Sequence, residues 1–205
     1  MMNEYSTNTT MKFASLVPHI HERLTVHHEI YSASCKAEYW EENVCVALKN
    51  AGFGSDWKPD FNHKSGKDQT TNDGVRISNK SGKLDFDSII ISGSRLTKHK
   101  TIEDKLQFLR QPKEDYILCL ATEKKDWKLG IKRYYLIVID SQQLNYHEQE
   151  WKETTGVRGS LKDELCGWSC SCERFTAKIS KNMSDQLWTR IKLDYCEEIH
   201  EIEIG

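Results

Sequence analysis

A short polar stretch, "GKDQTTNDGVRISNKSGK" at positions 66–83, carries the residue types that phosphodiester hydrolysis requires. It contains a carboxylate at Asp68, a hydroxyl at Ser78, an amide at Asn79 and an ammonium group at Lys80. A metal-dependent phosphodiesterase uses a carboxylate and a second oxygen ligand to hold Mg²⁺, and a cation that orients water and balances charge on the phosphate. The stretch therefore predicts either a reaction centre or a merely polar hairpin.

The pattern of the stretch indicates two short strands joined by a turn at positions 72–74, Asn-Asp-Gly. Side chains two positions apart on a strand share a face, so Ser78 and Lys80 are predicted to point the same way, with Asp68 close to them across the hairpin. Asn79 points to the other face. Its main-chain carbonyl remains available as a ligand for Mg²⁺.

The spacing of Asp68, nine intervening residues and Ser78-Asn79-Lys80 resembles the core motif of the PD-(D/E)XK nucleases, to which most type II restriction endonucleases belong. That motif is an Asp, a spacer, and then an acid, any residue and a Lys. The resemblance implies a restriction-endonuclease-like α/β core over about residues 34–140, with a mixed central β-sheet flanked by helices. It also implies that Asp68 holds Mg²⁺ and that Lys80 orients the attacking water.

Ser78 departs from the motif, because the family usually has Glu or Asp at that position. A missing carboxylate can come from a helix. Glu41 lies on the apolar face of the helix predicted over residues 34–52, where a carboxylate is costly unless it is paired or metal-bound. The alternative is a glutamate at the border of that face whose head reaches water or a Lys. Glu38 and Glu42 lie farther round the helix and are lesser candidates.

Two other aspartates compete with Asp68 for the catalytic role. Asp60 follows Pro59 but precedes a stretch that is typical of a loop, and Asp73 is explained by the turn. Basic side chains that could contact phosphates or bases accompany the hairpin on both sides. They are His63, Arg95, Lys98, Lys100 and Arg158.

Periodicity predicts the elements that position these residues. The N-cap of the helix over 34–52 is predicted at Ser34, with Gly52 just past its end, and Thr101 and Asp104 form an approximate capping box. The expected order is a weak helix over 18–33, the helix over 34–52, the hairpin, a strand over 87–94, a helix over 101–111, and strands over 115–123 and 133–140. This order favours an α/β fold built on a mixed sheet.

The C-terminal part, residues 141–205, is expected to add DNA-recognition and dimerisation structure to the core. Its stretch 141–168 is rich in side chains that can hydrogen-bond bases, although surface loops are usually polar as well. The tail is expected to form further strands or a helix. The 205 residues suit a single domain spanning 1–205.

Charge is distributed unevenly although the formal net charge is only −2. Residues 58–133 hold 17 Lys and Arg against 11 Asp and Glu, whereas the flanking segments are acidic. A basic middle suits a protein that meets phosphate on one face, but ordinary solvated charges explain it as well. A mean hydropathy of −0.68 and apolar runs of strand length predict a cytoplasmic protein without a membrane partner.

Seven cysteines are scattered through a chain with no export signal, and they are expected to be reduced. Three of them form the cluster "CGWSCSC", Cys166, Cys170 and Cys172. Structural zinc requires a second ligand pair at a comparable spacing, which the sequence does not provide, so buried or loop thiols are favoured.

These features predict a Mg²⁺-dependent type II restriction endonuclease that hydrolyses double-stranded DNA to leave 5′-phosphate ends, without a nucleotide cofactor. A small domain that cuts both strands of a palindrome is expected to act as a homodimer. Three alternatives remain open. They are a repair or junction-resolving nuclease on the same core, a DNA-binding module without catalysis, and an α/β interaction protein.

Overall fold

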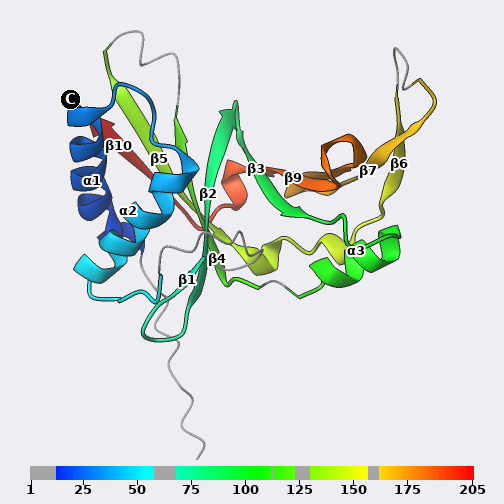
Figure 1. Ribbon diagram of the computed structural model, residues 1–205, viewed down its shortest axis with the longest axis horizontal. Helices are drawn as coiled ribbons and strands as arrows, with labels where there is room; N and C mark the ends of the chain where they lie inside the picture. Colours follow the sequence, from blue (N-terminus) through cyan, green and yellow to red (C-terminus); the bar gives the residue numbers. More distant parts are fainter. Residues whose placement is uncertain (1–12, 58–67, 112, 123–129, 157–161) are drawn as a thin grey trace, which may run out of the picture.

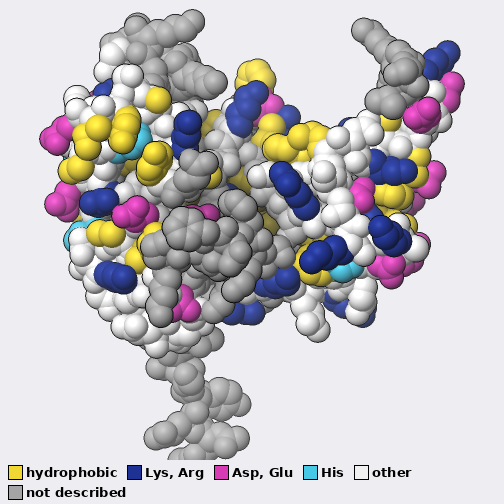
Figure 2. Space-filling model, viewed as in Figure 1, with side chains coloured by type: hydrophobic (Ala, Val, Ile, Leu, Met, Phe, Trp, Pro, Cys, Tyr) yellow, Lys and Arg dark blue, Asp and Glu magenta, His cyan; other side chains and the backbone are white. Residues whose placement is uncertain are grey.

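The computed structural model describes residues 13–57, 68–111, 113–122, 130–156 and 162–205, and Figure 1 and Figure 2 draw the remaining residues in grey. The helices are η1 (Phe13–Leu16), α1 (Val17–Ile30), α2 (Ala37–Asn50), α3 (Ile102–Leu109), η2 (Ser141–Gln143), η3 (Tyr146–Glu148), η5 (Lys181–Met183) and η6 (Leu193–Tyr195). The strands are β1 (Gln69–Thr70), β2 (Arg76–Asp85), β3 (Ser88–Arg95), β4 (Tyr116–Thr122), β5 (Lys132–Asp140), β6 (Lys152–Thr155), β7 (Leu165–Ser171), β8 (Phe175–Ser180), β9 (Gln186–Lys192) and β10 (Glu198–Ile204).

One mixed sheet runs through the molecule in the order β10-β5-β4-β2-β3-β9-β8-β7-β6, with β1 paired to β2. The β2–β4 pair is parallel, and the other pairs among the described strands are antiparallel. Figure 1 shows the sheet as two halves, because β3 curves away from β2 and carries β9, β8, β7 and β6 to the far side of the molecule. The prediction of an α/β fold with a mixed sheet is confirmed.

The two faces of the sheet belong to two hydrophobic cores. Helices α1 and α2 cover one face of the half that contains β2, β4, β5 and β10, and there Trp40 and Leu48 pack with Ile77 and Leu118. The indole N–H of Trp40 donates to the carbonyl of Leu118 at 3.1 Å, which fixes α2 over β4. The second core lies on the opposite face, beneath the curl of the sheet, where the side chains of the described strands pack with α3 and η3.

Local signals explain where the helices begin and end. Thr101 and Asp104 form the predicted capping box of α3. Gly52, with φ at +85°, follows the last turn of α2 as predicted, because its left-handed backbone favours glycine. The prediction of Ser34 as the N-cap of α2 was wrong. The helix begins at Ala37, and the backbone of Lys36 occupies the cap position without a side-chain hydrogen bond.

The C-terminal part is interleaved with the rest of the sheet. β10 pairs with β5 at one edge, and β9 pairs with β3 and carries the other half of the sheet. Within the stretch 141–168, the structure describes two single-turn helices, the short strand β6 and the start of β7. No helix in the described part of the chain combines the length and apolar composition needed to cross a bilayer.

Candidate functional site

The structure brings Asp68, Ser78 and Lys80 together as the spacing predicted. The Ser78 hydroxyl donates to Oδ2 of Asp68 at 3.2 Å, and Lys80 Nζ lies 3.9 Å from the same oxygen. The main-chain N–H of Asn79 also donates to Oδ2. The side chains of Asp68 and Lys80 are only 15% and 27% exposed, so their charges interact in a partly desolvated environment.

The cluster lies at the split of the sheet, the part of one edge of β2 between the segment that pairs with β1 and the segment that pairs with β3. β1 pairs with the beginning of β2 at Arg76 and Ile77, whereas β3 pairs with its last three residues, from Lys83 onward. Between these pairings, positions 78–82 of β2 have no neighbouring strand on that edge among the described residues. At Asn79, the Asp68 carboxylate accepts the main-chain N–H that a carbonyl of a neighbouring strand would otherwise accept.

The main-chain carbonyl of Asn79 faces the same edge of β2. The N–H and C=O groups of one strand residue point toward the same neighbour, and the N–H of Asn79 points to Asp68. The Asn79 side chain points to the opposite face, where it is buried and has no hydrogen-bond partner in the described part of the protein.

Glu114, just before β4, is the acidic residue that sequence reasoning missed. Burial raises the pKa of its carboxyl group, the positive charge of Lys80 lowers it, and the negative charge of Asp68 raises it again. The charges of Lys80 and Asp68 thus act on the Glu114 carboxyl group. The parallel pairing of β4 with β2 places Glu114 beside the beginning of β2, since Ile77 of β2 lies opposite Tyr116 of β4.

The adjacent residue Asp115 anchors this end of β4 to β2. Its Oδ2 accepts the main-chain N–H of Arg76 at 2.8 Å and the Nε–H at 3.2 Å, and its Oδ1 accepts from Nη2 at 2.6 Å. The Ser141 hydroxyl donates to the Glu114 carbonyl at 2.8 Å, which adds a third attachment from the end of β5. Glu114 therefore sits in a segment whose backbone is held on both sides.

The structure does not bring Glu41 to this cluster. Its helix, α2, packs on the face of β2 that carries Ile77, whereas Ser78 and Lys80 point to the opposite face, beside Ile117 and Cys119 of β4. Glu41 is half-buried on α2, but this helix does not lie on the face that carries Lys80. Glu114 is therefore the better candidate for the missing carboxylate.

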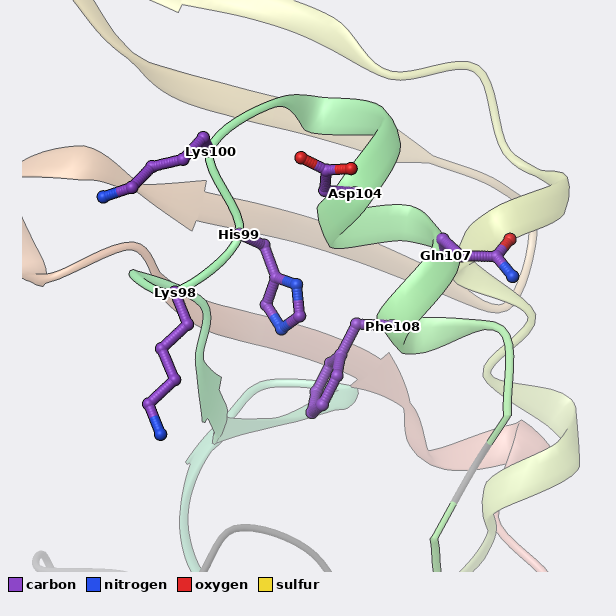
Figure 3. Close-up of a pocket in the computed structure, with 6 residues that line it drawn as sticks. All are labelled: Lys98, His99, Lys100, Asp104, Gln107 and Phe108. Carbon is purple, nitrogen blue, oxygen red and sulfur yellow. The ribbon is translucent and has the colours of Figure 1, made fainter.

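The predicted phosphate-binding residues fall in several places. Lys98 and Lys100 are exposed on the loop before α3 and line an open pocket of about 360 Å³ with His99, Asp104, Gln107 and Phe108. Figure 3 shows the ring of His99 directed at Phe108, with the two lysine side chains extending away from that pair. Arg95 ends β3 and its Nε–H donates to Gln186 at 3.3 Å. His63, Arg158 and the competing Asp60 lie outside the described residues.

Two of the amides at the beginning of α3 are bonded within the helix cap. The N–H of Thr101 donates to the Asp104 carboxylate, and the N–H of Asp104 donates to the Thr101 hydroxyl. Glu103 and Asp104 also place negative charge in the first turn. The capping box thus occupies two of the amides at this helix start, and its acidic residues work against anion binding there.

The cysteine cluster lies along β7 and the turn that follows it. Cys170 is buried in the second core, and Cys166 and Cys172 are half-buried. All seven cysteines of the chain are free thiols. Burial raises the pKa of Cys170 to about 12, so its thiol stays protonated at neutral pH. No group of three potential His, Cys, Asp or Glu ligands occurs in the described part of the chain.

The donor set at the split of the sheet is compatible with Mg²⁺. The three contacts of the Asp68 carboxylate with described residues all go to Oδ2, so Oδ1 has no partner among those residues. Glu114 supplies a second carboxylate and Asn79 a carbonyl oxygen. Mg²⁺ prefers oxygen ligands and usually takes one or two carboxylates, completing its shell with water and phosphate. Two carboxylates, a carbonyl oxygen and a lysine are the kinds of group that a metal-dependent phosphodiesterase uses.

Comparisons with protein-family models, with curated proteins and with solved structures find no match to this chain.

Proposed function

We propose that the protein is a Mg²⁺-dependent endodeoxyribonuclease whose reaction centre is formed by Asp68, Asn79, Lys80 and Glu114. The observation that carries this proposal is the convergence of two carboxylates and a lysine at the split edge of β2. Each of these groups has a distinct role in hydrolysing a phosphodiester. Their partial burial strengthens the interactions among their charges.

Asp68 Oδ1, the Glu114 carboxylate and the Asn79 carbonyl are the groups that would hold the metal. When bound, Mg²⁺ polarises the phosphate and stabilises the charge that develops on it. Lys80, fixed by its contact with Asp68, orients the attacking water and offsets negative charge on the phosphate. Ser78 keeps the Asp68 carboxylate in place by donating to Oδ2, and so positions a ligand without being one.

The specific form of the proposal is a type II restriction endonuclease of the PD-(D/E)XK group that acts as a homodimer. Its support is the order of helix, hairpin, strand, helix and strand around the Asp68-Ser78-Asn79-Lys80 motif. The departure from that group is the source of the second carboxylate, which we assign to Glu114 instead of to a residue of α2. The resemblance to that group implies cleavage of both strands of duplex DNA with 5′-phosphate ends.

Cleavage of phage DNA by the purified protein with Mg²⁺ tests the proposal, with Lys80→Ala beside Lys49→Ala as a matched control. Lys49 is an exposed lysine in the last turn of α2, the helix that packs on the face of β2 opposite to Lys80. Discrete fragments are expected from the wild type and from Lys49→Ala. Lys80→Ala is expected to lose at least about 100-fold in rate, the typical cost of one charge-stabilising group. Equal cleavage by both variants would refute the assignment.

A DNA-binding module without catalysis is the second candidate, and the contacts of Asp68 favour it. Its carboxylate accepts the Asn79 N–H at an unpaired strand edge, which is a sufficient structural reason for an aspartate. Tight binding with no cleavage in Mg²⁺ would identify this module. Cleavage restricted to branched DNA would identify a junction-resolving nuclease instead.

A further inference from the structure

The half of the sheet formed by β3, β9, β8, β7 and β6 has one covered and one uncovered face. Its covered face contributes Ile89, Phe175, Ala177, Ile179 and Ile191 to the second core. Among the described residues, α1, α2 and α3 leave the other face uncovered, since α1 and α2 belong to the first core and α3 to the second, and only the single turn η5 lies beside β7. Strand register determines which side chains this uncovered face presents.

Antiparallel pairing aligns one row of side chains straight across these strands. Lys152 lies opposite Ser169, Ser169 opposite Lys178, Lys178 opposite Trp188, and Trp188 opposite Ser92. Residues directly opposite each other point to the same face. Trp188 alternates with Leu187 and Thr189, which are buried on the covered side, so the row lies on the uncovered face.

A second row extends the same face to β2. Lys83 lies opposite Ile90, Ile90 opposite Arg190, and Arg190 opposite Thr176. We call the cations of this uncovered surface the basic sheet face. Its members are Lys83, Arg95, Lys152, Lys178, Arg190 and Lys192, all exposed.

Acidic side chains are almost absent from the basic sheet face. Asp85 is the one carboxylate at these strand positions among the described residues, and it pairs with Arg190 at 2.6 Å. Most of the remaining positions carry Ser, Thr or Gln, whose hydroxyl and amide groups donate to phosphates and sugars.

We propose that the basic sheet face binds the phosphate backbone of duplex DNA. From Lys83 on β2 to Lys152 on β6 the face crosses five strand spacings, about 24 Å at about 4.8 Å each. That width matches about seven base-pair rises of about 3.4 Å. A single strand would require several exposed aromatic platforms, whereas the aromatic side chain of the face is Trp188, which is only partly exposed.

This surface lies on the opposite face of the sheet from the proposed reaction centre. Lys80 points toward the second core side of β2, whereas Lys83, three residues later, belongs to the uncovered face. The choice of DNA as the ligand rests on the proposed function. The clustering of positive charge on this face is observed independently of that function. Binding and cleavage can therefore be altered separately by mutation.

Binding of a fluorescent DNA duplex, measured by anisotropy in EDTA over about 50–200 mM NaCl, tests the proposal without requiring cleavage. Lys83→Gln with Lys178→Gln is compared with Lys36→Gln and Lys49→Gln, two exposed lysines at the ends of α2. Each lost phosphate contact lowers the slope of log K against log[salt] by about 0.9. The basic-face double variant should therefore lose about 1.8 from that slope.

Over this fourfold range of salt concentration, the affinity of the wild type for duplex DNA should fall about twelvefold more than the affinity of the basic-face variant. The α2 double variant should match the wild type. The proposal is overturned if the salt slope of the basic-face variant equals that of the wild type. It is also overturned if both double variants lose the same amount of slope. Tighter binding of single-stranded RNA than of duplex DNA at this face also overturns it. Since EDTA removes the metal, failure to cut DNA with Mg²⁺ refutes only the nuclease assignment.

Discussion

The structural contacts of Asp68 and its proposed role as a metal ligand are separable, and Asp68→Asn distinguishes them. The carboxylate accepts the Asn79 N–H and the Ser78 hydroxyl and lies 3.9 Å from Lys80 Nζ, all through Oδ2. Asparagine has nearly the same shape and keeps one oxygen acceptor. The substitution therefore preserves a hydrogen bond at the edge of β2 and removes the negative charge that would hold Mg²⁺.

The cost in stability follows from these contacts. A hydrogen bond to a charged group contributes about 1.5–3 kcal/mol, and a neutral one about 0.5–1.5 kcal/mol. Asp68→Asn turns two hydrogen bonds to a charged group into weaker neutral ones, and it also frees the Lys80 side chain from its ion pair. The net effect should be to lower the free energy of unfolding by about 1–2 kcal/mol. For a chain of this size that corresponds to a fall in Tm of about 2–8 °C in EDTA.

The response to Mg²⁺ is the decisive measurement. At a Mg²⁺ concentration tenfold above its Kd, the wild type should gain about 1.4 kcal/mol, or about 3–6 °C in Tm. Asp68→Asn should lose this gain, and so should Glu114→Gln. Ser78→Ala removes a donor but no ligand, so it should keep both the Mg²⁺ response and cleavage. If Asp68→Asn retains the wild-type Mg²⁺ shift in Tm, the metal site has been assigned to the wrong residues.

Three further predictions concern the framework around the site. The hydrogen bonds from Arg76 lower the pKa of Asp115, so this pair should contribute about 1 kcal/mol above about pH 5 and lose that contribution as acid protonates the carboxylate. The stability difference between Asp115→Asn and wild type, measured by chemical denaturation, should therefore shrink as the pH falls below about 4, and a constant difference across pH would contradict this. Tyr134→Phe should cost about 1–3 kcal/mol in urea, because the tyrosine oxygen accepts the buried Cys35 N–H at 3.0 Å; an unchanged midpoint would argue against that bond. Gly167→Ala should cost at least about 3 kcal/mol, since a Cβ there would lie 1.9 Å from a carbonyl of β8 and φ is +149°; a folded variant with wild-type Tm would refute this.

Short-range patterns predicted the parts of the fold that depend on neighbouring residues. The capping box of α3, the left-handed Gly52 and the turn before β2 all follow from residue types a few positions apart. The shared direction of Ser78 and Lys80 follows from the two-residue period of a strand. Each of these inferences needed no knowledge of how the strands are ordered in the sheet.

Strand order decided what spacing alone did not predict. Glu114 reaches the cluster only because β4 lies parallel to β2, a pairing between segments nearly 40 positions apart. Glu41 was assigned to the site from its helical face, but that pattern does not specify which side of the sheet the helix covers. The capped start of α3 would have been visible in the sequence, because the acidic residues that supply its cap are the ones that repel an anion.

Side chains alternate between the two faces along β2, so the number of residues between Lys80 and Lys83 matters as much as the identity of the two lysines. Lys80 and Lys83 are an odd number of positions apart, so they occupy opposite faces. Deleting any one residue between them would make the spacing even and place both lysines on one side, while shifting Leu84 out of the second core. Substitutions can adjust either surface independently, whereas a single-residue insertion or deletion within this segment would damage both at once.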